Sequence, residues 1–399
     1  MSEMRVLKPR RAAPSDAVRP TRAEINLEAL RLNLRAVKRH AVSPASGDTP
    51  AKHSKVWAVL KADGYGHGAP AVARTLERAG ADGFCVALLE EGVELRDAGI
   101  VAPILVMGGY YPGAHAEVLA RKLTPVVYDV GQIEAFARLA RSGEVERPIP
   151  VHLKVDTGMA RLGVTMQALP ALAASLADFP EVEVAGLMTH LACAESGAEA
   201  TTEQMVLFDE ATALLARHGI RPKIRHAANS AALFHEQARL DAVRPGIAIF
   251  GVAPAGSDAS DLRLVMRVRT EIVSLRDLPV GAPVGYGALF RAKRPTRVAT
   301  IPMGYADGLS RALSNVGHVL VRGKRAPIVG AVSMDMTMID VTDLPGVELR
   351  DEAVVLGAQE GPLGKDAIGA TEIADAIGTI PWEVLTAVSR RVPRFYREP

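Results

Sequence analysis

VWAVLKADGYGHG, residues 56–68, joins a short apolar run to a glycine-rich turn. The run from Val56 to Leu60 has the length of a strand and contains no charged residue, which is typical of a strand buried on both faces. It ends at Lys61, and three glycines, a tyrosine and a histidine follow within seven residues. We therefore expect a buried strand, as in parallel sheets, with a lysine at its end.

Further runs of the same kind follow along the chain, and helical patterns separate them. The runs are GFCVAL (83–88), PILVMG (103–108), TPVVYD (124–129), PVHLKVD (150–156), VAGLMTH (184–190), IRHAAN (224–229) and AVRPGIAIFG (242–251). Eight strands that alternate with helices predict an α/β protein with a (β/α)8 TIM barrel. An open doubly wound sheet is the alternative, but its usual G-x-G-x-x-G turn is missing after the first strand.

The apolar spacing and closing glycines predict helices over residues 71–80, 133–143 and 202–219, and a first helix over 29–40 after a short strand. From about residue 263 the pattern changes to short β-rich runs between turns such as Leu344-Pro345-Gly346. We therefore predict three parts: a flexible basic tail (1–20), the barrel (21–262) and a C-terminal all-β domain (263–399).

The composition is that of a globular protein, with 48% hydrophobic residues, 23% charged residues and a net charge of +2. This charge balance implies no nucleic acid or other acidic partner. No stretch reaches the ~20 apolar residues of a membrane span, and no apolar stretch follows the basic tail as in a secretory signal. Cys85 and Cys193 make neither a disulfide framework nor a zinc site. We expect a cytoplasmic protein that needs no metal and no membrane.

Polar residues gather at the ends of five of the predicted barrel strands. Barrel strands present their carboxyl ends to one shared mouth, so these side chains are expected to lie together. Any one of them alone is more simply explained as a helix cap or a solvated residue, but jointly they predict an active site. They are Lys61 and Tyr65, Lys154, Asp156 and Arg161, His190, Asn229 and Ser230, and Arg244 with Gly246-Ile247.

A lysine at a strand end has a specific chemical use. A desolvated amine can lose its proton and form a Schiff base with the aldehyde of pyridoxal 5'-phosphate (PLP). The phosphate of PLP also needs a binding site. Asn229-Ser230 lies between a strand and the next helix, where a hydroxyl and helix N-terminal amides can bind an anion.

Seven motifs in order resemble those of the alanine racemase family. They are KADGYGHG (61–68), KVDTGMARLG (154–163), HAANS (226–230), VRPGI (243–247), VGYG (284–287), MGYADG (303–308) and SMDM (333–336), and the resemblance covers about residues 21–397. It implies a PLP-dependent isomerase that interconverts L-alanine and D-alanine and supplies D-alanine for cell-wall peptidoglycan.

The same resemblance implies two opposed bases. Lys61 would bind PLP and act on one face of the substrate Cα, and Tyr286 would act on the other face. Tyr286 would come from the partner subunit, which implies a head-to-tail homodimer with shared active sites. A phenol is a weak acid, so Tyr286 would need nearby positive charge or donors to serve as a base.

Further roles follow from the matching positions. Arg244 would face the pyridine nitrogen, where a group that only donates disfavours ring protonation and so suppresses side reactions. Arg161 would orient the substrate carboxylate, and Lys154 would carry a carbamate that positions Arg161. His190 would lie beside the ring. Tyr65, Ser230, Gly246 and Ile247 would hold the phosphate, and Asn229 would also bind the cofactor. The partner's Met334 and Tyr305 would border the substrate, with Asp335 at the entrance.

Two departures from the family pattern stand out. Asp63-Gly64 replaces the commoner Asn-Ala, and Arg390 stands before R-V-P-R where many members have a tyrosine that supports the phosphate. The alternatives to an alanine racemase are a broader amino-acid racemase on the same scaffold, an amino-acid decarboxylase of the same architecture, and a non-catalytic PLP-binding protein, which would resemble the barrel alone.

Overall fold

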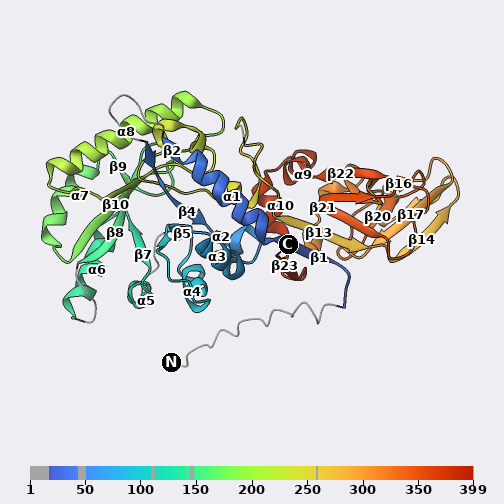
Figure 1. The fold of residues 1–399 in the computed structure, drawn as a ribbon, viewed down its shortest axis with the longest axis horizontal. Coiled ribbons are helices and arrows are strands. Elements are labelled where there is room, and N and C mark those ends of the chain that lie inside the picture. Colours follow the sequence, from blue (N-terminus) through green and yellow to red (C-terminus); the bar gives the residue numbers. More distant parts are fainter. Residues whose placement is uncertain (1–17, 44–50, 109–112, 144–147, 258, 399) are drawn as a thin grey trace. The chain divides into compact units, whose positions relative to one another are not determined.

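The computed structural model describes residues 18–43, 51–108, 113–143, 148–257 and 259–398. The chain folds as two compact units (Figure 1). One runs from Ala29 to Arg263, and the other joins the residues up to Glu28 to those from Leu264 onward. Most of the predicted basic tail, residues 1–17, lies outside the described residues.

The Ala29–Arg263 unit is a nearly closed parallel barrel, in which eight main strands fall within the described residues. They pair in the order β11-β10-β8-β7-β6-β5-β4-β12. The two outer strands are linked by hydrogen bonds from Asp241 N to Arg225 O and from Arg244 N to Ala228 O, both 2.9 Å long. The predicted TIM-barrel fold is confirmed. The strands are β4 (Lys55–Val59), β5 (Gly83–Val86), β6 (Ile104–Val106), β7 (Thr124–Val127), β8 (Ile149–Asp156), β10 (Val182–Met188), β11 (Ile224–His226) and β12 (Ala242–Val243).

The helices lie on the outside of this ring of strands (Figure 1). The helix α3 shows the pattern well, since its Val72 and Leu76 are fully buried, as their spacing predicts. The strands are buried on both faces, and all residues of β5 and β6 are inaccessible or nearly so. The helices are α1 (Leu27–His40), α2 (Lys61–Tyr65), α3 (Ala69–Arg78), α4 (Leu89–Asp97), α5 (His115–Ala120), α6 (Val130–Arg141), α7 (Leu169–Ser175) and α8 (Ala198–Arg217).

The eighth strand is shorter than the predicted run of residues 242–251. It ends at Val243, and Ile247–Phe250 forms a 3-10 helix, η5. Pro245 has no amide to donate to a neighbouring strand, and Gly246 departs from strand geometry with φ −109° and ψ −88°. The backbone therefore turns across the mouth of the barrel at the point where the sequence alone suggests a continuous strand.

The second unit is built from antiparallel sheets. Its largest sheet contains β13 (Met266–Glu271), β18 (His318–Val321), β19 (Lys324–Pro327), β21 (Glu352–Gly361) and β22 (Gly364–Ile368). A smaller sheet joins β14 (Ser274–Leu278), β17 (Thr296–Ile301) and β20 (Thr337–Asp340). A hairpin, β15 (Pro283–Val284) with β16 (Phe290–Arg291), and two helices, α9 (Ala370–Ile377) and α10 (Pro381–Ala387), complete it.

The first strand, β1 (Arg22–Asn26), pairs antiparallel with β13 and parallel with β23 (Arg394–Arg397). The sequence predicts this strand, but we assigned it to the barrel segment of residues 21–262. Its pairing assigns it to the second unit, so this sheet is completed by residues from both ends of the chain. A local sequence pattern can identify a strand, but it does not reveal which sheet the strand joins.

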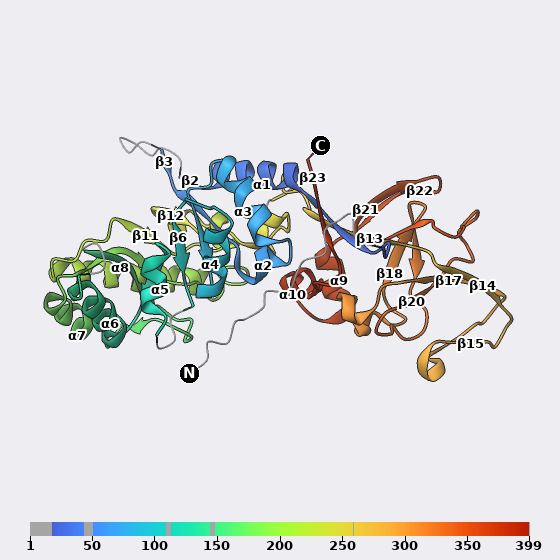
Figure 2. The ribbon, with the colours of Figure 1, turned by 90° about the horizontal axis from the view of Figure 1, so that it is seen from below.

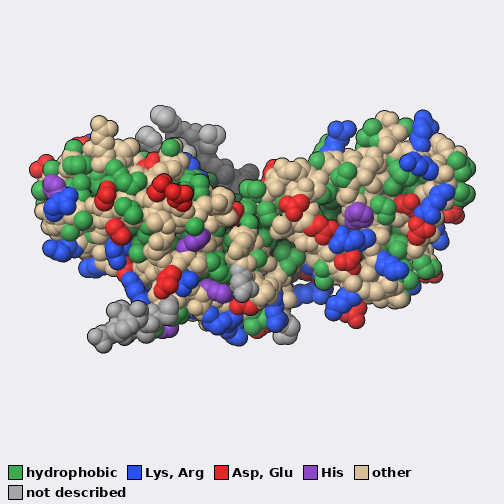
Figure 3. All heavy atoms as spheres, turned by 90° about the horizontal axis from the view of Figure 1, so that it is seen from above, with side chains coloured by type: hydrophobic (Ala, Val, Ile, Leu, Met, Phe, Trp, Pro, Cys, Tyr) green, Lys and Arg blue, Asp and Glu red, His purple; other side chains and the backbone are tan. Residues whose placement is uncertain are grey.

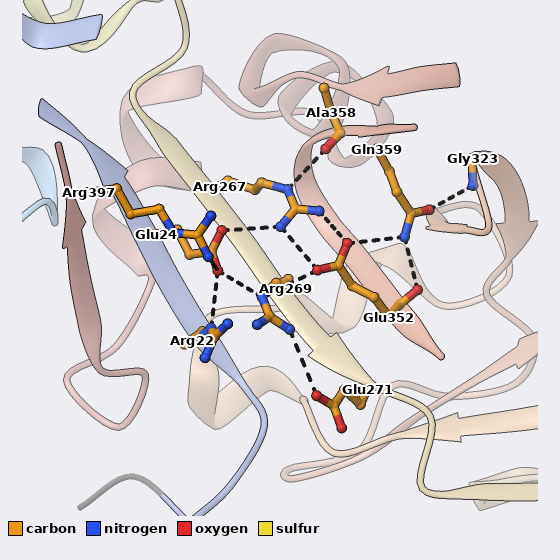
Figure 4. A network of polar contacts seen from close by, with 10 residues as sticks. All are labelled: Arg22, Glu24, Arg267, Arg269, Glu271, Gly323, Glu352, Ala358, Gln359 and Arg397. Atoms are coloured by element: carbon orange, nitrogen blue, oxygen red, sulfur yellow. Dashed lines mark hydrogen bonds and ion pairs between the residues drawn. The ribbon is translucent and has the colours of Figure 1, made fainter. Parts of the chain in front are cut away.

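An ion-pair network ties β1 into its sheet (Figure 4). Glu24 is 4% exposed, and its two carboxylate oxygens accept hydrogen bonds from four arginines. Glu352 of β21 receives further bonds and ion pairs from two of the same arginines. We call Glu24, Glu352 and these arginines the Glu24 network; the arginines are Arg22, Arg267, Arg269 and Arg397.

Acidic and basic side chains are interspersed on the face drawn in Figure 3, rather than gathered by sign. Among the described helices, none combines the length and the apolar character that crossing a membrane requires.

Candidate active site

Lys61 lies two residues after the end of β4 and begins a turn with unusual backbone geometry. The five residues after it, from Ala62 to Gly66, all have positive φ, between 52° and 79°. Three of the five are not glycine, and a left-handed conformation costs an L-residue roughly 1–2 kcal/mol. Gly64, with φ 61°, relieves this strain at the middle of the turn, so the Asp-Gly departure from the family pattern has a local physical benefit.

Two carboxylates hold this strained turn. Glu91 of α4 accepts hydrogen bonds from the amides of Ala62, Ala87 and Leu88, at 2.6, 2.8 and 3.1 Å. Asp63 accepts from the amide of Ala69, at 2.8 Å, where α3 begins. Glu91 is not among the site residues predicted from the sequence. Its place at the third position of a helix, where a glutamate can bond backwards to amides, is the signal that could have found it.

The predicted phosphate residues come together around Gly246. Ser230 Oγ accepts from Gly246 N at 2.8 Å and from Ala248 N at 3.4 Å. A Cβ added to Gly246 would lie 2.2 Å from the hydroxyl oxygen of Tyr65, so only glycine allows this close approach. Ile247 follows as the first residue of η5. Asn229 differs in its contacts: its Oδ1 accepts from Ala232 N at 2.9 Å, a capping bond.

Arg244 lies in the barrel interior and is 2% exposed. Its Nη1 bonds to His226 Nδ1 at 2.7 Å, and its Nη2 donates to Thr189 O at 2.8 Å and to Ala227 O at 3.0 Å. Because arginine can only donate, His226 Nδ1 is the acceptor, and its ring is neutral. Complete burial lowers the pKa of Arg244 to about 10. Among the described residues, no carboxylate pairs with this guanidinium.

Lys154 and Arg161 lie on and after β8. Lys154 is 4% exposed, and desolvation, followed by the positive charges of Arg161 and Arg244, lowers its pKa to about 8. Desolvation and the charge of Arg161 also lower the pKa of Lys61, although the Lys61 side chain reaches solvent. These mutual effects bring Lys61, Lys154, Arg161 and Arg244 into one group, which we call the mouth cations.

His190 follows β10 at the same mouth. Desolvation, and then the charges of the mouth cations with Arg244 first, lower its pKa to about 3. His190 is therefore a neutral ring at any ordinary working pH. A neutral, half-buried imidazole beside four cations is suited to contact an aromatic ring, because it adds no fifth charge.

The second unit carries the remaining predicted residues on exposed loops. Tyr286 is 76% exposed, between Gly285 and Gly287 at the end of the β15–β16 hairpin. Figure 2 shows this hairpin projecting from the sheets of its unit. Tyr305 and Met334 are 43% and 52% exposed, and their loops touch, because Tyr305 N donates to Ser333 O at 3.0 Å.

Asp335 is also exposed, and it lies close to an arginine near the end of the chain. Asp335 accepts a 2.6 Å hydrogen bond from Arg391, whose Nε also lies 3.5 Å from the buried Asp307. Arg390, which stands where many family members have a tyrosine, is exposed. Asp335 is therefore held in place by an ion pair with the segment that contains this departure.

The residues at the barrel mouth are suited to an anionic, phosphorylated aldehyde. The four mouth cations form no ion pair with a carboxylate in the described part of the chain. The nearby Glu91 is occupied by backbone amides, and so is Asp156, which accepts from three of them. A phosphate, a phenolic oxygen and a substrate carboxylate would compensate the cations. The Tyr65 hydroxyl approaches Gly246 closely and Ser230 bonds to the Gly246 amide, so these three residues lie together at the mouth.

Comparison with known proteins agrees with this chemistry. A family model described as "Alanine racemase, N-terminal domain" matches residues 25–254, and one described as "Alanine racemase, C-terminal domain" matches residues 265–396. An alanine racemase of Sorangium cellulosum is 58% identical over 387 residues, which span 96% of this chain and 100% of the relative. One from Symbiobacterium thermophilum is 44% identical over 385 residues, or 96% of this chain and 98% of the relative.

The crystal structure of alanine racemase from Bartonella henselae with covalently bound pyridoxal phosphate superposes with a TM-score of 0.83. It is 31% identical in sequence, and the match covers 95% of this chain and 99% of that one. Both units, the order of the motifs and the cationic mouth thus lead to one conclusion. The chain belongs to the alanine racemase family, the PLP-dependent isomerases that interconvert L-alanine and D-alanine.

Proposed function

We propose that this chain racemises alanine with two bases, Lys61 and Tyr286, on opposite faces of the substrate Cα. The observation that carries the proposal is the position of Lys61 just after β4, where desolvation and then the charge of Arg161 lower its pKa. An amine with a lowered pKa is more often neutral, and only the neutral amine can bind an aldehyde or accept a proton.

PLP, when bound, withdraws electrons from the substrate Cα and so makes its proton easier to remove. Arg244 is the group that we assign to the pyridine nitrogen. Its charge is fixed in the barrel by a neutral histidine and two carbonyl oxygens, and it can only donate a hydrogen bond. Such a partner limits the reaction to removal and return of one proton. Tyr65, Ser230, Gly246 and Ile247 are the groups that we assign to the phosphate.

Arg161 is our candidate for the substrate carboxylate, and Lys154 for a carbamate that positions Arg161. A Lys154 pKa of about 8 supports this assignment, because an amine reacts with carbon dioxide in its neutral form. A carbamate would also replace a buried positive charge beside Arg161 by a negative one, which turns repulsion into attraction.

We further propose that Tyr286 works in the active site of a partner subunit, in a head-to-tail homodimer. Its exposure of 76% supports this, as do the exposed Tyr305 and Met334, because large side chains that are exposed together often mark an interface. Supply of D-alanine for peptidoglycan and a cytoplasmic location remain predictions. A broader substrate range is the alternative, and racemisation rates over a panel of amino acids distinguish it.

Mixing two inactive variants tests both the bases and the shared site. Lys61→Ala and Tyr286→Phe should each lose racemisation, and Tyr286→Phe should keep its PLP. After subunit exchange, half of the dimers are hybrids with one intact site, so about a quarter of the wild-type activity should return. The control is Lys61→Ala mixed with the double variant, which can form no intact site.

Two results would contradict the proposal. Recovery in the control would mean that exchange is not the source of the activity. No recovery in the test mixture, with exchange verified by native mass spectrometry, would place both residues in one subunit's site or remove one of them from catalysis.

A further inference from the structure

Gln204 is a buried polar side chain that the predicted mechanism does not use. It lies on α8 and is 5% exposed. Its amide makes three hydrogen bonds: Oε1 accepts from Ala192 N at 2.8 Å, and Nε2 donates to Thr157 Oγ1 and to His190 O, both at 3.2 Å. The three partners belong to two loops at the barrel mouth, one after β8 and one after β10.

The loop after β8 carries Arg161, and it is a compact unit. Asp156 Oδ1 accepts hydrogen bonds from three successive backbone amides, those of Gly158, Met159 and Ala160, at 2.9 to 3.1 Å. Beyond Arg161, β9 (Val164–Thr165) returns to pair with the end of β8. Because both ends of the loop are closed in this way, a shift at its base is passed to the arginine.

Thr157 is the base of this loop, and Gln204 anchors it. The Thr157 hydroxyl also bonds to the Thr189 hydroxyl at 2.7 Å. The Thr189 carbonyl in turn accepts from Arg244. Gly158, with φ 138°, lies against Gln204, since a Cβ placed there would come 3.4 Å from the glutamine Cγ. One amide is therefore linked to the loops of Arg161 and His190, and through two threonines to Arg244.

We propose that Gln204 is a positioning residue, which keeps the loops of Arg161 and His190 in register at the carboxyl ends of the neighbouring strands β8 and β10. This inference rests on the substrate role proposed for Arg161. Only an uncharged amide suits the place, because the site needs one acceptor for Ala192 N and donors for Thr157 and His190 O. A carboxylate there would face the His190 carbonyl without a proton to donate.

The test uses the PLP-loaded enzyme with Gln204→Met, which keeps the length of the side chain and removes its hydrogen bonds. kcat/KM for alanine should fall about tenfold, mainly through a higher KM, because a mobile Arg161 binds the substrate carboxylate less well. The affinity for PLP should change less than about twofold. The control is Gln237→Met, since Gln237 is exposed and bonds only Thr202 of α8 among the residues described.

A double-variant comparison separates positioning from plain stability. In an Arg161→Ala background, Gln204→Met should reduce kcat/KM by less than about threefold, because its route through the arginine is already gone. The isosteric Thr157→Val removes the same bond from the loop side and should also raise KM, which keeps the test valid if Gln204→Met folds poorly.

The outcomes distinguish the possible failures. An unchanged KM in both Gln204→Met and Thr157→Val, or the same tenfold loss in both backgrounds, would overturn the positioning role alone. An Arg161→Ala enzyme with normal KM would overturn the proposed role of Arg161 and, with it, this inference.

Discussion

The two units each hold arginines away from solvent, but they compensate the charge in opposite ways. In the Glu24 network, four arginines surround a buried carboxylate, and Glu352 neutralises two of them further. At the barrel mouth, Arg244 is more deeply buried and bonds only to a neutral histidine and two carbonyl oxygens. The chain itself compensates the charges of the Glu24 network, whereas the charge of Arg244 has no carboxylate partner among the described residues.

This difference separates structure from function. An uncompensated buried charge costs folding free energy, so a site that keeps one gives up stability for a ligand that supplies the missing anion. The two buried mouth cations, Lys154 and Arg244, therefore indicate a binding site on physical grounds, even without the family motifs. The Glu24 network also has four cations, but they are paired with carboxylates and hold the first strand in the sheet of the second unit.

The largest effect is expected for Arg244→Met. Loss of the donor that we assign to the cofactor ring should lower kcat/KM about a hundredfold. The stability of the PLP-free protein should change by less than about 1 kcal/mol, because removal of an unpaired buried charge offsets the lost hydrogen bonds. Steady-state kinetics and urea unfolding measure the two quantities. If the variant loses more free energy of unfolding than the free energy that corresponds to its fall in kcat/KM, Arg244 is mainly structural.

Glu24→Gln should show the reverse behaviour. Four arginines would lose their shared carboxylate, and the second unit should lose about 2 kcal/mol of stability, which is below the usual value for a buried pair because the arginines are partly exposed. Urea unfolding followed with a probe in that unit measures it, with Glu360→Gln, from an exposed pair, as the control. An unchanged free energy of unfolding would mean that the Glu24 network does not stabilise the pairing of β1 with its sheet.

Acid should weaken the barrel through its buried histidines. Desolvation, and then the charge of Arg244, lowers the pKa of His152 to about 3, and His226, 2.7 Å away, is lowered well below its ordinary value by the same causes. The unfolded chain then binds more protons than the folded one below pH ~6.5, so stability falls with pH from there towards pH 3.

The matching variant is His152→Gln. Between pH 7.5 and pH 5.5, each histidine that stays neutral in the folded state lowers the free energy of unfolding by about 1.4 kcal/mol. The variant lacks one such histidine, so its free energy of unfolding should fall by roughly that amount less than in the wild type. Unfolding midpoints of the two proteins at both pH values give the comparison. Equal losses in wild type and variant would show that the acid sensitivity arises elsewhere.

Much of the fold could be predicted from the sequence, because the positions of its strands and helices depend on local patterns of residues. The eight apolar runs, the closing glycines of the helices and the change of pattern near residue 263 are all visible within short windows, and the barrel they predict is present. The clustering of Lys61, Lys154, Arg161 and Arg244 followed from one rule, that the strands of a barrel end at the same mouth. The chemical identity of these residues was likewise readable, since a lysine at a strand end and an ordered set of motifs are sequence properties.

The tertiary structure decided the features that no short stretch of sequence contains. It assigned β1 to the sheet of the second unit, ended the eighth strand at Val243, and gave the turn after Lys61 its left-handed backbone. It also placed Gln204 against Thr157, 47 positions away in the chain. Periodicity reports which face of an element is apolar, but hydrogen bonds between elements depend on positions that only the packed fold sets. The sequence by itself therefore determined which residues gather at the barrel mouth and which roles we predict for them, and the fold determined what holds them in place.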